Sequence, residues 1–123
     1  MVVLPDHLHP VWRLPESDDR YSTRLQVFKS RFTQALKAKG VRMPRHGNGE
    51  PALWARRFWE HTIRDDDDLR AHVEYVHYTP VKHGLTDRVS AWPYSTFHRD
   101  VALGGVHRDW GVVSVGLNVS GCE

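Results

Sequence analysis

The sequence has little cysteine and no long apolar run. Cys122 is the single cysteine among 123 residues, so the chain alone cannot close a disulfide, which favours a reducing compartment. No apolar stretch approaches the roughly 20 residues of a membrane-spanning helix, and the first residues lack the pattern of a secretory signal. These absences predict a cytoplasmic globular protein, and the length suits one domain.

Acidic residues are scarce in the middle of the chain. Between Arg20 and Arg64, eleven Lys or Arg residues accompany only Glu50 and Glu60, although the net charge of the whole chain is only +2. A basic segment of this kind is typical of proteins that bind a polyanion. A solvated basic helix face without a partner explains the charge equally well.

Hydrophobic periodicity predicts both strands and helices. The apolar residues 1–4 predict a strand that continues through 11–12, and the aromatic residues 53–63 predict a strand or an extended segment. The clearest helix covers 21–39, where Tyr21, Leu25, Phe28, Phe32 and Leu36 form one apolar stripe. Gly40 is then the expected C-terminal cap.

A second helix is expected to begin at the acidic run 65–68, because acids in a first turn complement the helix dipole. Leu69, Val73 and Val76 mark its expected buried face. Pro80 either kinks this helix or begins a new turn, and Gly84 ends it. Two short helices at 87–92 and 94–103 complete the prediction.

His7-Leu8-His9 is a candidate metal site. Alternate side chains of a strand point to the same face, so the two imidazoles can hold one divalent ion while Leu8 turns to the core. His-x-His also arises by chance in a chain with nine histidines. The other histidines, His83 among them, carry no signal individually.

Tyr75 is a candidate nucleophile. In a helix, Asp68, His72, Tyr75 and Thr79 share one polar side, opposite the apolar residues. A tyrosine hydroxyl attacks a phosphate only with help from a metal or from neighbouring cations. The alternative is a structural tyrosine at the edge of the core.

Arg56 and Arg57 lie among aromatic residues, a combination that suits phosphate clamping and base stacking. The alternative is a set of core aromatics flanked by solvated charge, which explains Phe58 and Trp59 better.

Four ordered motifs resemble one family, the REP-associated tyrosine transposases, which are HUH transposases with a single catalytic tyrosine and an IS200-like domain. The first joins VVLPDHLH at 2–9 to WRLP at 12–15; the others are RFWEHTIR at 57–64, VEYVHYTPVKHGL at 73–85 and WPYSTFHR at 92–99. Residues 1–111 would then form a partial IS200-like domain, followed by a divergent tail at 112–123. The implied fold is α+β, a ferredoxin-like antiparallel sheet with packed helices.

The resemblance implies an enzyme that nicks and rejoins single-stranded DNA. Tyr75 would attack the phosphate and form a 5′-phosphotyrosine, while His7, His9 and Thr79 would bind Mg²⁺ or Mn²⁺. The implied partners are the hairpins of repetitive extragenic palindromes. Six basic residues would contact this DNA: Arg24, Lys29, Arg31, Arg56, Arg57 and Lys82.

Two departures from the family pattern bear on activity. The family usually has Asn at the position of Thr79, and its members begin with a strand and a helix ahead of the His-x-His strand. Without these elements we expect an exposed strand edge at 2–12, exposed Leu4, Leu8 or Trp12, and self-association as a homodimer. The alternative functions are a truncated remnant that only binds hairpin DNA, and a fragment that does not fold stably.

Overall fold

The computed structural model describes residues 1–49, 51–55 and 57–112. The chain divides into two compact units, one made of residues 1–12 together with the part from Thr62 onward, and the other of residues 13–61. The expected tail at 112–123 lies outside the described residues except for Val112.

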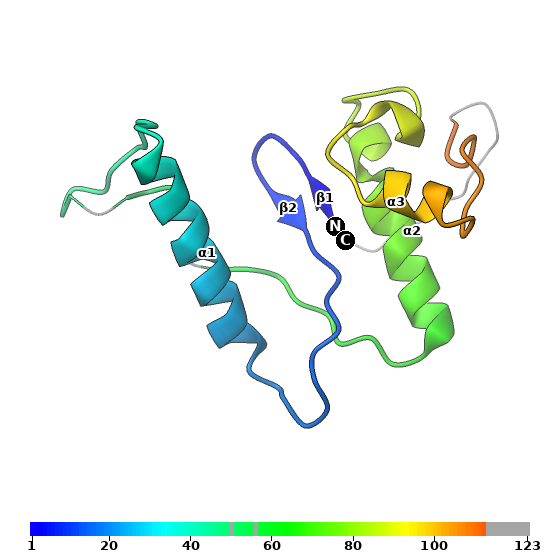
Figure 1. The fold of residues 1–123 in the computed structure, drawn as a ribbon, viewed down its shortest axis with the longest axis horizontal. Coiled ribbons are helices and arrows are strands. Elements are labelled where there is room, and N and C mark those ends of the chain that lie inside the picture. Colours follow the sequence, from blue (N-terminus) through cyan, green and yellow to red (C-terminus); the bar gives the residue numbers. More distant parts are fainter. Residues whose placement is uncertain (50, 56, 113–123) are drawn as a thin grey trace. The chain divides into compact units, whose positions relative to one another are not determined.

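The first unit opens with a β-hairpin (Figure 1). Strands β1 (Val2–Val3) and β2 (Leu8–His9) are antiparallel, with Val2 opposite His9 and Val3 opposite Leu8. The Leu4 amide donates to the His7 carbonyl at 2.8 Å and closes the turn. The predicted strand at 1–4 is confirmed in part, whereas residues 11–12 lie outside any strand.

The other edge of β1 is paired as well, contrary to the sequence-based expectation. The Val3 amide donates to the Tyr94 carbonyl and the Thr96 amide donates to the Met1 carbonyl, both at 2.9 Å. Leu4 is only 5% exposed, so the expectation that it is left uncovered was wrong. Trp12 is 41% exposed. Self-association through an edge stays a prediction.

Helix α2 (Asp66–Lys82) begins where the acidic run predicted. The Asp65 carboxylate caps it by accepting the Asp68 amide at 2.8 Å. Pro80 lies inside the helix and does not end it. After Lys82, the amides of Gly84 and Leu85 donate to the carbonyls of Val81 and Pro80, and Gly84 has a φ of 70°. This pattern is a Schellman cap, which explains why a glycine ends the helix.

The core of the first unit lies against the C-terminal half of α2. One cluster contains Val2, Leu4 and Val76. A second contains Val81, Val89 and Phe97, contributed by α2, the 3-10 helix η1 (Val89–Ala91) and α3 (Phe97–Ala102).

The buried face of α2 therefore differs from the predicted one. Val76 is buried as expected, but Leu69 is 40% exposed because the packing partners lie further along the helix. The two short helices that the sequence predicted correspond to η1 and α3.

The second unit consists of α1 (Tyr21–Ala38) and the segment that packs along it. Helix α1 confirms the helix predicted from the apolar stripe. Gly40 follows it in the left-handed conformation, with a φ of 73°, as expected for a C-terminal cap. Phe28 and Phe32 contact the Trp54 ring at centroid distances of 6.3 and 5.6 Å. In the described part of 53–63 no residue belongs to a strand or a helix, so the predicted strand is absent there.

The antiparallel hairpin and the three helices confirm the α+β class. None of the helices in the described ranges is long and apolar enough to cross a membrane.

We expect Phe97→Ala to destabilise the first unit strongly. The Phe97 side chain is fully buried in the second cluster, and removing a buried Phe ring costs about 3–5 kcal/mol. Urea denaturation followed by circular dichroism measures this change. Leu103→Ala is the control, since Leu103 is 77% exposed and its loss is expected to change the stability by no more than about 0.5 kcal/mol. Equal effects of the two substitutions would contradict the assigned core.

Candidate active site

The hairpin brings His7 and His9 together. Their ring centroids lie 5.0 Å apart at an interplanar angle of 83°. The Nδ1 atom of His7 is hydrogen-bonded to the Asp6 carboxylate. This contact, together with the charge of His7, lowers the pKa of Asp6. Because a carboxylate only accepts, Nδ1 of His7 carries the proton, and in the neutral ring Nε2 keeps a free lone pair.

His9 carries an unusual polar atom. In the described part of the chain its Nε2 atom is buried and has no hydrogen-bond partner. Burial lowers the pKa of His9, and the neighbouring His7, His83 and Lys82 lower it further, so the neutral imidazole is favoured. A buried nitrogen without a partner is costly in a native protein. A neutral imidazole in this state is suited to a metal ligand.

Tyr75 on α2 lies beside this pair. Its ring is 6.2 Å from the His9 ring, and the side chain also packs against the cluster of Val2, Leu4 and Val76. Lys82, two turns further along the helix, donates to the Tyr75 hydroxyl at 3.3 Å, and its Nζ lies 5.0 Å from the centre of the tyrosine ring. The structure thus supplies a positive charge next to the candidate nucleophilic oxygen.

His83, the residue after α2, completes this group. Its ring centroid is 5.3 Å from that of His7. The sequence patterns did not single out His83 or Asp6. Two features of the sequence could have indicated them. Asp6 directly precedes His7, and Lys82 and His83 follow Tyr75 by two helical turns.

Thr79 occupies a different environment from Tyr75. Its side chain is fully buried, and its hydroxyl donates to the Val76 carbonyl at 2.6 Å. Pro80 explains this contact, because a proline has no amide hydrogen and leaves the carbonyl four residues before it, that of Val76, without its helical partner. The Thr79 hydroxyl supplies that partner. The predicted metal role of Thr79 stays a prediction.

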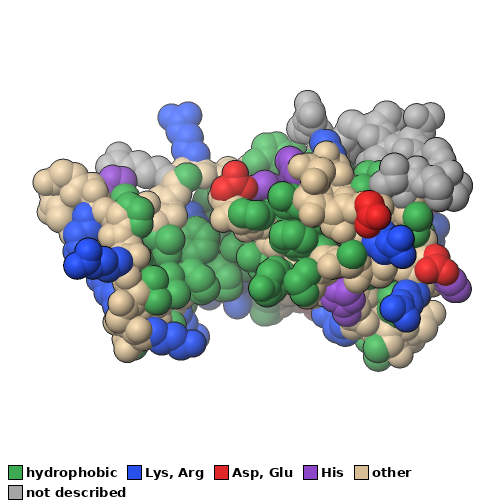
Figure 2. Space-filling model, turned by 90° about the horizontal axis from the view of Figure 1, so that it is seen from above, with side chains coloured by type: hydrophobic (Ala, Val, Ile, Leu, Met, Phe, Trp, Pro, Cys, Tyr) green, Lys and Arg blue, Asp and Glu red, His purple; other side chains and the backbone are tan. Residues whose placement is uncertain are grey.

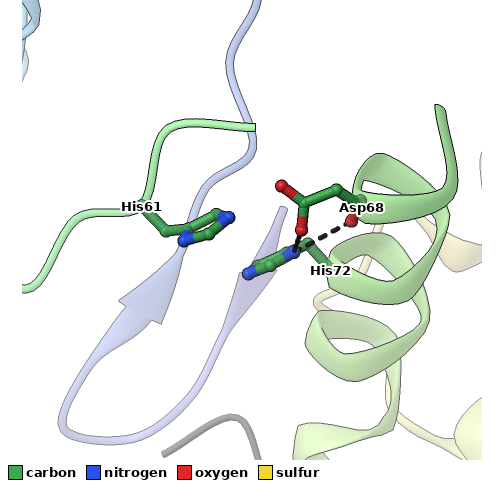
Figure 3. A group of neighbouring side chains, drawn as sticks. All are labelled: His61, Asp68 and His72. Atoms are coloured by element: carbon green, nitrogen blue, oxygen red, sulfur yellow. Dashed lines mark hydrogen bonds and ion pairs between the residues drawn. The ribbon is translucent and has the colours of Figure 1, made fainter. Parts of the chain in front are cut away.

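The start of α2 holds a second polar pair, Asp68 and His72 (Figure 3). Nδ1 of His72 lies 2.9 Å from the Asp68 carbonyl oxygen and 3.0 Å from its carboxylate. The same carboxylate accepts the Arg64 amide at 3.0 Å. The Asp68 carboxylate thus connects His72, one turn further along α2, to the backbone of Arg64 before the helix.

The predicted DNA-binding residues are divided between the two units. Lys82 lies at Tyr75 in the first unit. Arg24 pairs with Asp18 and, with Arg20, lowers the pKa of that carboxyl to about 2. Lys29 lies 5.7 Å from the ring centroids of both Trp54 and Phe58, so it takes part in packing.

The other predicted DNA-binding residues of the second unit that the structure describes, Arg31 and Arg57, are exposed. Arg31 lines an open pocket on α1 together with Arg20, Arg24, Phe28 and Phe32. Figure 2 shows Lys and Arg side chains on the surface of this unit, at the left. Trp59, two positions further along the chain than Arg57, is 71% exposed and stacks on His61. Arg56 lies outside the described residues.

Comparisons with known proteins agree on one family, although no family model matches the chain. A Haemophilus influenzae protein named as a REP-associated tyrosine transposase is 47% identical over 111 residues, which cover 89% of this chain and 63% of the relative. The chain is a homologue of the REP-associated tyrosine transposases. The REP-associated tyrosine transposase of Escherichia coli is 48% identical over 109 residues, 89% of this chain and 59% of that protein.

A solved REP-associated tyrosine transposase, bound to a REP hairpin, has a similar fold. The TM-score is 0.74 at 44% sequence identity, and the match covers 95% of this chain and 64% of the other. The chain therefore spans about three-fifths of the length of the transposases that it matches.

Proposed function

We propose that this chain carries the catalytic centre of a REP-associated tyrosine transposase and nicks and rejoins single-stranded hairpin DNA. The observation that supports this most directly is the Tyr75 hydroxyl, which accepts a hydrogen bond from Lys82 beside the ring of His9. Homology to transposases, one of which has been solved with a REP hairpin, supplies the substrate class.

Tyr75 is the proposed nucleophile. Its hydroxyl oxygen forms a bond to phosphorus, the bond from phosphorus to the 3′ oxygen breaks, and that oxygen leaves with a proton as a 3′-OH. The product is a 5′-phosphotyrosine. Attack by the 3′-OH of a second strand reverses the step and joins DNA without an external energy source. Lys82 places its charge next to the oxygen on which negative charge develops as the tyrosine loses its proton.

The residues present fit a divalent metal, Mg²⁺ or Mn²⁺. His9 offers a buried nitrogen without a partner, and His7 offers Nε2 while Asp6 holds its Nδ1. A carboxylate behind a ligating histidine is a common arrangement, because it fixes the tautomer and the orientation of the ring. A metal held there would supply Lewis-acid polarisation of the scissile phosphate.

Arg57 and Trp59, two positions apart in the chain, are the proposed contacts to single-stranded DNA in the second unit. Both are exposed; an arginine can bind a phosphate, and a base can stack on an exposed aromatic ring. Arg31 on α1, in the pocket that it lines with Arg20 and Arg24, is a further proposed contact.

We expect Tyr75→Phe to abolish the covalent adduct and to spare DNA binding, because the substitution removes only the hydroxyl. The measurement uses a REP-type hairpin oligonucleotide labelled at its 3′ end, incubated with Mn²⁺ and analysed on a denaturing gel. The label on the 3′ side stays with the protein, whereas a label at the 5′ end is released on a shorter strand.

The matched control is Tyr78→Phe. Tyr78 belongs to the second core cluster, and its ring lies 6.4 Å from that of Trp110, so the phenylalanine preserves its packing. This variant is expected to form the adduct. Adduct formation by Tyr75→Phe, or its loss only in Tyr78→Phe, would reject Tyr75 as the nucleophile.

We expect His9→Ala to weaken Mn²⁺ binding to the free protein. Loss of residues that merely support metal ligands costs about 10–100-fold in affinity, so loss of a ligand is expected to cost at least as much. Electron paramagnetic resonance of unbound Mn²⁺ measures the affinity without DNA. The control is His107→Ala, because the His107 side chain is 81% exposed. Unchanged Mn²⁺ affinity in His9→Ala would remove the metal from the proposal.

We expect Arg57→Gln to reduce the salt dependence of hairpin binding. Each phosphate contact with a single strand contributes about −0.7 to the slope of log affinity against log salt, so the slope should become shallower by about that amount. Fluorescence anisotropy over a salt series measures the slope. Arg108→Gln removes the same charge from an exposed position in the first unit. Equal slopes for the two variants would show that Arg57 contacts no phosphate.

A further inference from the structure

The open pocket on α1, which we call the α1 pocket, has both an apolar and a basic lining. Its volume is about 700 Å³, within the range of small-ligand sites in proteins. The apolar part consists of Val27, Phe28 and Phe32. The basic part consists of three arginines, Arg20, Arg24 and Arg31. The pocket therefore suits a ligand that is itself partly apolar and partly anionic.

The two phenylalanine rings of the α1 pocket are held in place by Trp54. The centroid of the Trp54 ring lies 6.3 Å from that of Phe28 and 5.6 Å from that of Phe32. The indole nitrogen of Trp54 donates to the Thr33 hydroxyl at 3.1 Å, which fixes Trp54 against α1. Phe32 is nevertheless 45% exposed. An exposed aromatic ring in a fixed position is preorganised for stacking.

The arginines of the α1 pocket carry an excess of positive charge. Arg20 and Arg24 share one carboxylate, that of Asp18, so one positive charge of this pair is unbalanced. Among the described residues no carboxylate pairs with Arg31. Arg24 and Arg31 are seven positions apart, which places them on one side of α1 and about 10 Å apart along its axis. Guanidinium groups therefore line the pocket at two levels of the helix.

A nucleotide is the ligand that this combination fits best. A guanidinium group matches a pair of phosphate oxygens, and a base can stack on an aromatic ring. The base has to be unpaired, because a base inside a duplex is stacked between its neighbours and is not accessible to a side chain. A protein surface fits less well, since an apolar partner would strip water from the guanidinium groups without supplying acceptors.

We propose that the α1 pocket binds one unpaired nucleotide of the DNA hairpin, with its base on Phe32 and its flanking phosphates at Arg24 and Arg31. The inference rests on the proposed function, because it concerns the same DNA. It involves neither Tyr75 nor the metal, so binding can be measured apart from cleavage.

The test compares two DNA probes by fluorescence anisotropy, with a chelator present. One probe is a hairpin with an unpaired loop and unpaired flanks, and the other is a blunt duplex of the same stem. We expect Phe32→Leu to weaken hairpin binding at least about fivefold, the lower end of what one stacked base contributes, and to leave duplex binding unchanged. The control is Tyr21→Leu, because Tyr21 is 39% exposed on the same helix and does not line the pocket.

An abasic series identifies the bound nucleotide. Each unpaired nucleotide of the hairpin is replaced in turn by an abasic site. We expect one replacement to weaken binding to the original chain and to have no further effect in Phe32→Leu, because base and ring form a single contact. Additive losses at every position would show that no base contacts Phe32, and would overturn the proposal.

Arg31→Gln tests the pocket without changing the contact with Trp54. We expect the slope of log affinity against log salt for the hairpin to become shallower by about 0.7, the contribution of one phosphate contact in a single strand. Lys37→Gln removes an exposed charge from α1 outside the pocket and is expected to keep the slope. Thermal unfolding checks that each variant folds. If Phe32→Leu does not fold, the slope of Arg31→Gln decides.

The outcomes separate this inference from the proposed function. Unchanged hairpin affinity in Phe32→Leu and an unchanged slope in Arg31→Gln overturn the nucleotide site, and the proposed function stands if Tyr75 still forms the adduct. Weaker hairpin binding in Phe32→Leu without any adduct at Tyr75 supports the pocket and contradicts the proposed chemistry. A dimer that Phe32→Leu converts to a monomer in sedimentation velocity, with unchanged DNA binding, overturns the inference in favour of a second copy on this face.

Discussion

The pairing of β1 on both edges is the constraint on which the candidate site depends. Val2 is fully buried because β2 lies on one side of it and the segment at Ser95 on the other, and it packs against Val76 of α2. The same contacts hold the strand of His9 next to the helix of Tyr75. Chain segments more than ninety positions apart therefore meet at β1, as the Val3 amide shows by donating to the Tyr94 carbonyl at 2.9 Å. Without this packing, the histidines and the tyrosine would have no common position.

Helix α2 carries two groups of side chains, one buried in the core and one facing the hairpin. Val76, Thr79, Pro80 and Val81 are buried and anchor the helix. His77 belongs to this side, where burial lowers its pKa to about 4, and its ring is hydrogen-bonded to Thr96 at 3.0 Å. Tyr75, Lys82 and His83 lie toward the hairpin and carry the polar chemistry. A helix anchored in this way can present a nucleophile and a cation at fixed positions, as catalysis requires.

Pro80 has a consequence for the chemistry of the site. It removes one backbone hydrogen bond from α2, and the neighbouring Thr79 compensates with its side chain. Thr79 lies on the same side of the helical wheel as Tyr75, but its hydroxyl is already hydrogen-bonded to the Val76 carbonyl. Side-chain spacing could not show this, because helical periodicity describes direction and not the hydrogen bonds that a side chain makes.

Local sequence determined much of this protein. The stripe of α1, the acidic start and glycine end of α2 and the alternation in His7-Leu8-His9 each depend on neighbouring residues, and each was predictable from them. The motifs, taken in order, also indicated the transposase family, which the similar proteins support. Tertiary structure decided the rest. The burial of Leu4, the exposure of Leu69 and the place of His83 beside His7 all depend on segments distant in the sequence. Periodicity cannot encode such contacts, because it specifies which face of an element is apolar but not which other element covers it.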